Sequence, residues 1–223
     1  TQVATLYAMT VPYYNDFSNE ATGNGKAPKY WTNGNWAKTV SATNSYRPSV
    51  NTSAWKARDE VGYPIPAEVK TPSLKLYAEA KSTSSTAKAS QPYVALPELT
   101  GVDVKNVSLS FWAWSSCETR SSKKDPVIND YIYSTTGYDY ELKIGVMTDI
   151  TDQSTLTEVT SVTVIGDTVK QPLYFFVDMS SYQGSGKYIV LYMDNQATKT
   201  SDIYIDNFRI NLSSTPKRVT DVQ

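Results

Sequence analysis

Histidine is absent from this 223-residue chain, and its absence excludes more chemistry than any other feature of the composition. Histidine is the commonest general base, the commonest zinc ligand and the usual partner of a catalytic serine. Cysteine is nearly absent too. Cys117 stands alone, which excludes an internal disulfide framework and leaves its thiol without a histidine to activate it. We therefore predict that the chain is not an enzyme.

A surplus of one charge and long apolar runs are also lacking. The 21 Lys and Arg residues nearly balance the 22 Asp and Glu residues, so the sequence gives no positive field that would attract nucleic acid. No run approaches the roughly 18 apolar residues of a membrane-spanning helix. We expect neither nucleic acid as a partner nor direct membrane insertion.

The chain is rich instead in residues that favour strands and turns. Ten Gly, 11 Pro, 17 Tyr and many Thr, Ser and Val residues are typical of short strands joined by turns. No long window carries a sustained helical period. Roughly ten alternating segments predict an all-β fold with little helix, a two-sheet antiparallel β-sandwich with jelly-roll topology of the galactose-binding-like or concanavalin-like kind.

The strongest strand pattern lies at residues 104–115. Apolar residues from Val107 to Ala113 alternate with a second set that runs from Ser108 to Trp114, so one face should meet the core. We expect Asn33-Gly34 to form a hairpin turn and residues 117–136 to form a long polar loop. Further strands are expected at 1–11, 73–78, 93–99, 138–147, 157–164, 171–177, 187–194 and 202–210.

We expect one domain with short flanking segments. Residues 1–10 would be a lead-in strand or linker, residues 11–212 a single sandwich, and residues 213–223 a linker. The strand at 202–210 would close the domain and carry Asp206 just before the chain leaves it.

Several segments, taken in order, resemble one family. The chain resembles the cleaved-adhesin, MAM-like and choice-of-anchor jelly-roll domains of secreted and surface proteins from anaerobic bacteria, over about residues 11–210. The matching segments are Val11-Pro-Tyr-Tyr-Asn-Asp-Phe17, Ala27-Pro-Lys-Tyr-Trp31 with Asn35-Trp36, Ala95-Leu-Pro-Glu-Leu99 leading into Val107-Ser-Leu-Ser-Phe-Trp112, Leu142-Lys-Ile-Gly-Val-Met-Thr-Asp149, Phe176-Val-Asp-Met-Ser-Ser-Tyr182, Tyr188-Ile-Val-Leu191 and Tyr204-Ile-Asp-Asn-Phe-Arg-Ile210.

The resemblance implies an extracellular or cell-surface location in a bacterium, with neighbouring domains in the same chain. Segment 216–222 resembles the start of a fibronectin type III module.

The resemblance also implies a structural calcium between the first and last strands, with Asp16 and Asp206 as ligands. This chain departs from the family pattern at Phe17-Ser18, where the family has Phe-Glu. The alternative is that Asp206 accepts hydrogen bonds from backbone amides of the opening segment.

Tryptophan supplies the candidate carbohydrate-binding residues, which are Trp31, Trp36, Trp55, Trp112 and Trp114. Trp112 and Trp114 share a strand face about 7 Å apart, which would make a stacking platform for sugar rings. The alternative is that this face packs under a loop, because large aromatic side chains mostly supply core area.

Two functions remain open from the sequence. The first is a non-catalytic, adhesin-like module that binds carbohydrate on a polysaccharide or glycoprotein surface. The second is a structural spacer or protein-interaction module of a surface assembly with no small ligand.

Overall fold

The computed structural model describes residues 7–37, 47–52, 65–78, 90–116, 118–127, 129–135, 139–164, 172–194 and 201–213. The predictions for Trp55, Cys117, residues 1–6 and residues 214–223 lie outside these described residues. The division into a lead-in segment, one domain and a linker therefore stays a prediction.

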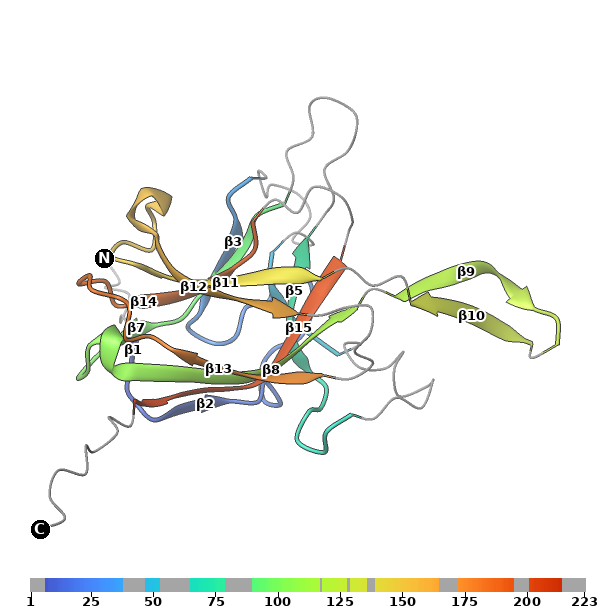
Figure 1. The fold of residues 1–223 in the computed structure, drawn as a ribbon, viewed down its shortest axis with the longest axis horizontal. Coiled ribbons are helices and arrows are strands. Elements are labelled where there is room, and N and C mark those ends of the chain that lie inside the picture. Colours follow the sequence, from blue (N-terminus) through green and yellow to red (C-terminus); the bar gives the residue numbers. More distant parts are fainter. Residues whose placement is uncertain are drawn as a thin grey trace, which may run out of the picture.

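Two sheets lie face to face as the layers of a sandwich (Figure 1), and every pairing within them is antiparallel. The five-stranded sheet has the order β12 (Thr157–Val164), β11 (Tyr140–Met147), β14 (Tyr188–Tyr192), β6 (Pro92–Ala95) and β3 (Thr32–Asn35). The six-stranded sheet has the order β13 (Leu173–Asp178), β8 (Val107–Ser116), β15 (Ser201–Leu212), β5 (Ser73–Ala78) and β4 (Ser49–Asn51), with β2 (Tyr13–Asn15) also paired to β15. The predicted two-sheet sandwich is confirmed.

Helix is scarce, as the composition predicts. Within the described residues it is limited to two short 3-10 turns, Val104–Asn106 and Gln153–Thr155. None of the helices found there is long and apolar enough to cross a membrane. A short parallel pair, β1 (Ala8–Met9) with β7 (Glu98–Leu99), lies beside the sandwich.

The core fills the space between the two sheets, and β8 contributes to it as its alternation predicts. Val107, Leu109 and Phe111 are fully buried in the main cluster, together with Ile203 and Ile205 of β15. Burying one such side chain contributes roughly 1.5–3 kcal/mol to folding. The residues of β8 that alternate with these, including Trp112 and Trp114, point to the outer face of the six-stranded sheet.

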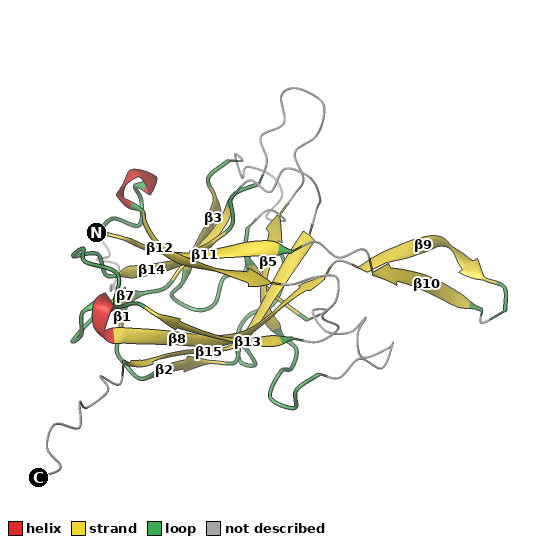
Figure 2. Cartoon of the chain, in the orientation of Figure 1, coloured by secondary structure: helices red, strands yellow, loops and turns green. Residues whose placement is uncertain are grey.

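Two local predictions are wrong. Asn33-Gly34 lies inside β3 and forms no turn, because the Tyr93 ring covers Gly34 so closely that a side chain there would overlap it. Residues 117–136 contain a hairpin, β9 (Glu118–Asp125) and β10 (Asp130–Thr135), which projects from the sandwich (Figure 2). The β-favouring run Tyr131-Ile-Tyr133 outweighs the polar composition of that segment.

The closing strand β15 joins the first and last parts of the domain. It pairs with β8 over most of its length, with β5 through residues 201–205 and with β2 through residues 208–210. A register shift lies between Asp206 and Arg209, and Asn207 adopts a positive φ of 49° there. The opening segment therefore lies beside the end of the closing strand.

Candidate functional site

The outer face of the six-stranded sheet is rich in aromatic side chains. On β8 this face carries Trp112 and Trp114, and strand pairing places Tyr174 of β13 opposite Trp112. Phe176, two residues further along β13, lies opposite Ser110. Directly opposite residues of neighbouring strands share one face, so these side chains form a continuous surface.

A loop covers one tryptophan of the predicted pair and leaves the other partly exposed. Trp114 is buried in a small cluster with Val69 and Tyr204, and Ile65 packs against that cluster, so segment 65–70 covers this end of the face. The alternative prediction, that this face packs under a loop, is therefore correct for Trp114. Trp112 lies at the border, half-buried, with its ring 5.5 Å from that of Tyr174 in an edge-on contact.

Beyond the loop the face is open, and we call its exposed part the aromatic platform: Tyr14, Trp112, Tyr174, Phe176 and Arg209. Phe176 is 66% exposed, Tyr174 54% and Tyr14 47%. One row of this surface runs across four strands, from Phe176 over Ser110 and Arg209 to Tyr14. With a strand spacing near 4.8 Å, the row is about 14 Å long.

The β2 end of the platform is held in place by two contacts. The Arg209 guanidinium lies 4.0 Å from the centre of the Tyr14 ring, which is a cation–π contact. The Tyr14 hydroxyl donates a hydrogen bond to the Asn207 side-chain carbonyl. Both side chains are therefore ordered before any ligand arrives, which lowers the entropy lost on binding.

The platform combines two kinds of group that a sugar needs. A pyranose ring has a face of C–H groups, which stacks on aromatic rings, and a rim of hydroxyls, which requires hydrogen-bonding partners. Phe176, Tyr174 and Trp112 supply ring surface. The Arg209 guanidinium and the Tyr174 hydroxyl supply polar contacts on the same face.

The other two described tryptophans lie away from the platform. Trp31 is a core residue whose ring contacts Phe17 and Phe208 edge-on and whose Nε1 donates to the Tyr13 hydroxyl at 3.0 Å, so its faces are occupied by protein. Trp36 lies half-buried on the outer face of the five-stranded sheet. It stacks on Tyr93 with 4.2 Å between ring centroids.

The predicted metal ligands lie at the junction of β2 and β15. Asp206 is fully buried, and its two carboxylate oxygens accept the backbone N–H groups of Asn207 at 2.7 Å and Lys70 at 2.8 Å. Burial raises the pKa of Asp206 to about 7, and the negative charge of nearby Asp16 acts in the same direction. In contrast, a hydrogen bond from Ser18 lowers the pKa of Asp16.

The hydrogen-bond donors to Asp206 differ from those expected in the sequence-based alternative, in which backbone amides of the opening segment donate to it. Its backbone partners come from its own strand and from segment 65–70, and neither belongs to the opening segment. Within the described part of the chain, no three Asp, Glu, His or Cys side chains gather as a metal site. Calcium here would therefore depend on two carboxylates plus carbonyl oxygens such as that of Glu68, which is 2.5 Å from the Asn207 amide nitrogen.

Sequence reasoning missed most of the platform. Tyr174 and Phe176 alternate within β13, but alternation alone does not tell which face meets the core. Tyr14 and Arg209 come together only through the pairing of β2 with β15, nearly 200 positions apart.

The fold and this face define a jelly-roll sandwich with an open aromatic surface. No protein-family model matches the sequence, and no curated protein matches it. The solved structures similar to it include three cleaved adhesin domains of Lys-gingipain, two of them recorded from Porphyromonas gingivalis W83.

These matches cover nearly the whole fold. The K2 domain is 12% identical with a TM-score of 0.55, covering 90% of this chain and 99% of that chain. The K1 domain is 13% identical with a TM-score of 0.53, covering 90% and 98%. The K3 domain is 12% identical with a TM-score of 0.50, covering 89% and 96%. The chain therefore shares the fold of cleaved adhesin domains, which confirms the resemblance at the level of fold.

Proposed function

We propose that this chain is a non-catalytic, carbohydrate-binding module of a secreted or surface protein, and that the aromatic platform is its binding face. The observation that carries the proposal is the row with the exposed rings of Phe176 and Tyr14 at its ends and Arg209 between them. Its length of about 14 Å accommodates a stretch of glycan chain better than a single sugar.

Exposure of these particular side chains supports the proposal. Tyr174 and Phe176 are large aromatic residues that lie mostly in solvent, on a strand whose alternate residues serve the core. Contiguous apolar surface of this kind is uncommon on a folded protein unless it contacts a ligand or partner. Arg209 and the tyrosine hydroxyls make the surface amphipathic, which favours a sugar over a purely apolar ligand.

Affinity electrophoresis tests the proposal. The protein is run through gels that contain one soluble polysaccharide each, from a panel that covers plant, bacterial and mucin glycans. We expect retardation by at least one polymer. We expect Phe176→Ala and Tyr174→Ala each to weaken it about tenfold, because each removes ring surface that is buried in the complex.

Leu212→Ala is the matched control. Leu212 is 63% exposed, comparable to Phe176, but lies at the end of β15 away from the platform, so its removal should leave retardation unchanged. If no polysaccharide retards the wild type, the chain is instead a spacer or protein-interaction module. Retardation that survives both platform substitutions would place binding elsewhere.

We also propose a structural calcium that links Asp16 and Asp206. Two carboxylates at the junction of β2 and β15, one of them buried, support a bound cation, because a divalent charge favours their ionised forms. The bound ion would stabilise the pairing of the first and last strands and takes no part in the carbohydrate contacts.

A further inference from the structure

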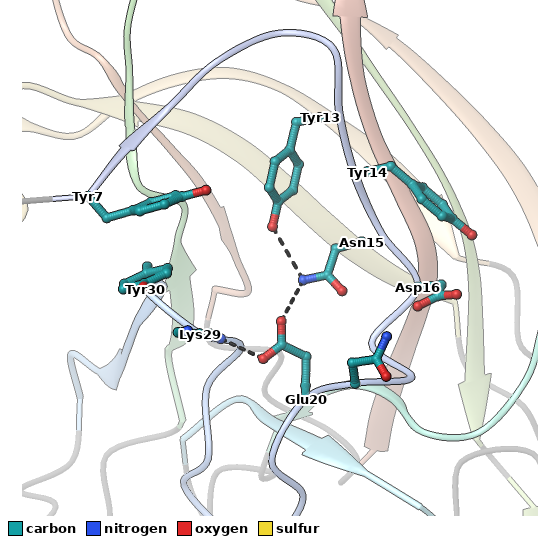
Figure 3. A pocket seen from close by; sticks show the side chains of 9 residues that line it. Tyr7, Tyr13, Tyr14, Asn15, Asp16, Glu20, Lys29 and Tyr30 are labelled. Carbon is teal, nitrogen blue, oxygen red and sulfur yellow. Dashed lines mark hydrogen bonds between the residues drawn. The ribbon is translucent and has the colours of Figure 1, made fainter.

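A cavity of about 430 Å³ opens beside β2, and Tyr14 lines both this cavity and the platform. Figure 3 shows Tyr7, Tyr13 and Tyr30 around it, with Asn15 and Glu20 at its centre. Strand β2 and three neighbouring parts of the chain build this cavity, namely the residue before β1, the turn after β2 and the turn before β3. Its volume falls in the usual range of small-molecule sites.

The polar groups of the cavity are held in fixed positions. Glu20 accepts hydrogen bonds from the Asn15 amide at 2.9 Å and from the Lys29 backbone N–H at 2.7 Å, one on each carboxylate oxygen (Figure 3). Each of those oxygens can accept another bond. The carboxylate is thus oriented by neutral donors and retains acceptor capacity toward the cavity.

The Tyr13 hydroxyl completes the polar set as a donor. Its oxygen accepts from the Trp31 ring nitrogen at 3.0 Å and from the Asn15 amide at 3.3 Å. A hydroxyl that accepts two hydrogen bonds has its own proton left to donate. Burial raises the pKa of Tyr13, which keeps that proton in place at neutral pH. A fixed donor therefore lies close to a fixed acceptor.

The aromatic wall of the cavity includes a residue with a strained backbone conformation, Tyr30. Tyr7 and Tyr30 stack with their ring centroids 4.0 Å apart, and they are 46% and 52% exposed. Tyr30 holds this position with a φ of 68°, a conformation that is unfavourable for a bulky side chain. Strained residues that persist in a structure are often functional, and here the strain presents a ring to the cavity.

The charges of the cavity decide which ligand fits. Asp16 and Glu20 line it together with Lys29, whose ammonium group lies 4.9 Å from the centre of the Tyr30 ring. In calcium-free buffer, two carboxylates with one ammonium disfavour an anion, and Lys29 competes with a cationic ligand for the part of the Tyr30 ring that Tyr7 does not cover. A neutral molecule with several hydroxyls satisfies both the acceptors and the donors.

We propose that this cavity is a second binding site, specific for a single neutral monosaccharide unit. It shares the ligand class of the proposed function but uses different residues, apart from the shared border at Tyr14. A glycan chain on the platform and a terminal sugar in the cavity would give the module two contacts with a branched or multivalent glycan surface.

NMR titration of the full chain in calcium-free buffer tests this site. The probes are the methyl glycosides of glucose, galactose, mannose and N-acetylglucosamine, with N-acetylneuraminic acid and lysine as charged comparisons. We expect at least one neutral glycoside, and neither charged probe, to shift backbone resonances of residues 13–20 and 29–30. Binding should weaken about tenfold in Glu20→Gln, which loses a charged acceptor.

Tyr30→Gly is the sharper variant, because glycine adopts a positive φ freely. We expect it to fold with unchanged or higher stability and to lose monosaccharide binding, a combination that a purely structural role for Tyr30 would not produce. Phe176→Ala should leave this binding intact, so failure of the platform and failure of the cavity are distinguishable. The absence of neutral-sugar shifts, shifts that persist in Tyr30→Gly, or a preference for a charged probe would overturn the proposal.

Discussion

At the scale of single residues, Asp206 shows how the closing strand controls a charge. The side chain is fully buried, and two backbone N–H groups only partly replace the water that its carboxylate has lost. Burial is the largest cause of its raised pKa, and the charge of Asp16 adds to it. The protonated form is consequently favoured in the folded state and the ionised form in the unfolded state.

This predicts that stability falls as pH rises. Between the ordinary pKa of 3.8 and the folded value of about 7, the unfolded chain ionises at position 206 while the folded chain keeps its proton. In calcium-free buffer we expect Asp206 to lower the free energy of unfolding by roughly 4 kcal/mol from pH 3 to pH 8, with little further change above pH 8. Urea denaturation at each pH measures it.

Asp206→Asn provides the comparison. Burial also raises the pKa of Asp202, so part of the pH dependence should remain in the variant, and the difference between the two proteins is the quantity to measure. Equal slopes in wild type and Asp206→Asn would show that Asp206 does not titrate in this range.

Calcium should offset the loss of stability that ionisation of Asp206 causes at neutral pH. A divalent ion bound to Asp16 and Asp206 favours both ionised carboxylates, and binding only to the folded state adds about 2.7 kcal/mol at one hundred times the dissociation constant. We expect the melting temperature at pH 7.5 to rise with calcium, to fall with a chelator, and to respond little in Asp206→Asn. Identical melting curves in calcium and chelator would retire the calcium site.

At the scale of elements, β3 illustrates why a local motif was misleading. Asn-Gly is a strong hairpin signal, yet here the glycine gives room for an aromatic ring from the neighbouring strand β6. Tyr93 lies over Gly34 and stacks on Trp36 with 4.2 Å between their centroids. Glycine is therefore needed at position 34 because Tyr93 packs directly over it on the outer face of the five-stranded sheet.

We expect Gly34→Ala to destabilise the protein by about 1–3 kcal/mol, the usual result of forcing extra volume into a packed site. The added methyl group would lie 2.5 Å from a Tyr93 ring atom, so the ring has to move, and Trp36 with it. Chemical denaturation followed by tryptophan fluorescence detects both effects.

Thr32→Ala, on the same face of β3, is the control and should change stability little because Thr32 is exposed. In a Gly34→Ala, Tyr93→Ala double variant the overlap is gone, so the two effects should not add. Full additivity would contradict the close contact.

At the scale of the whole molecule, the sequence predicted what depends on alternation and missed what depends on distant pairing. The core face of β8 followed from Val107, Leu109 and Phe111 alone. The covering of Trp114 was only one of two alternatives, because the residues that cover it, 65–70, lie over 40 positions upstream. The hairpin at 118–135 was missed because β9 is polar and lacks the apolar alternation on which strand prediction depends, so the β-favouring run in β10 was given too little weight.

The sequence predicted the kind of site, aromatic rings on an outer strand face, but not the residues that form it. Trp112 was placed correctly on an outer face, but its neighbours Tyr14, Tyr174 and Phe176 come from strands at opposite ends of the chain. Only the strand order β13, β8, β15, β2 gathers them on one surface (Figure 1). Sequence alone therefore indicates a class of ligand more readily than the residues of a candidate site.

A glycan array probed with wild type and the Tyr174→Ala, Phe176→Ala double variant tests the central claim most directly. We predict a defined set of glycans bound by the wild type and lost from the double variant, whose stability should stay nearly unchanged because both side chains are exposed. An array that stays blank with the wild type, or the same glycans bound equally by both proteins, would contradict the account.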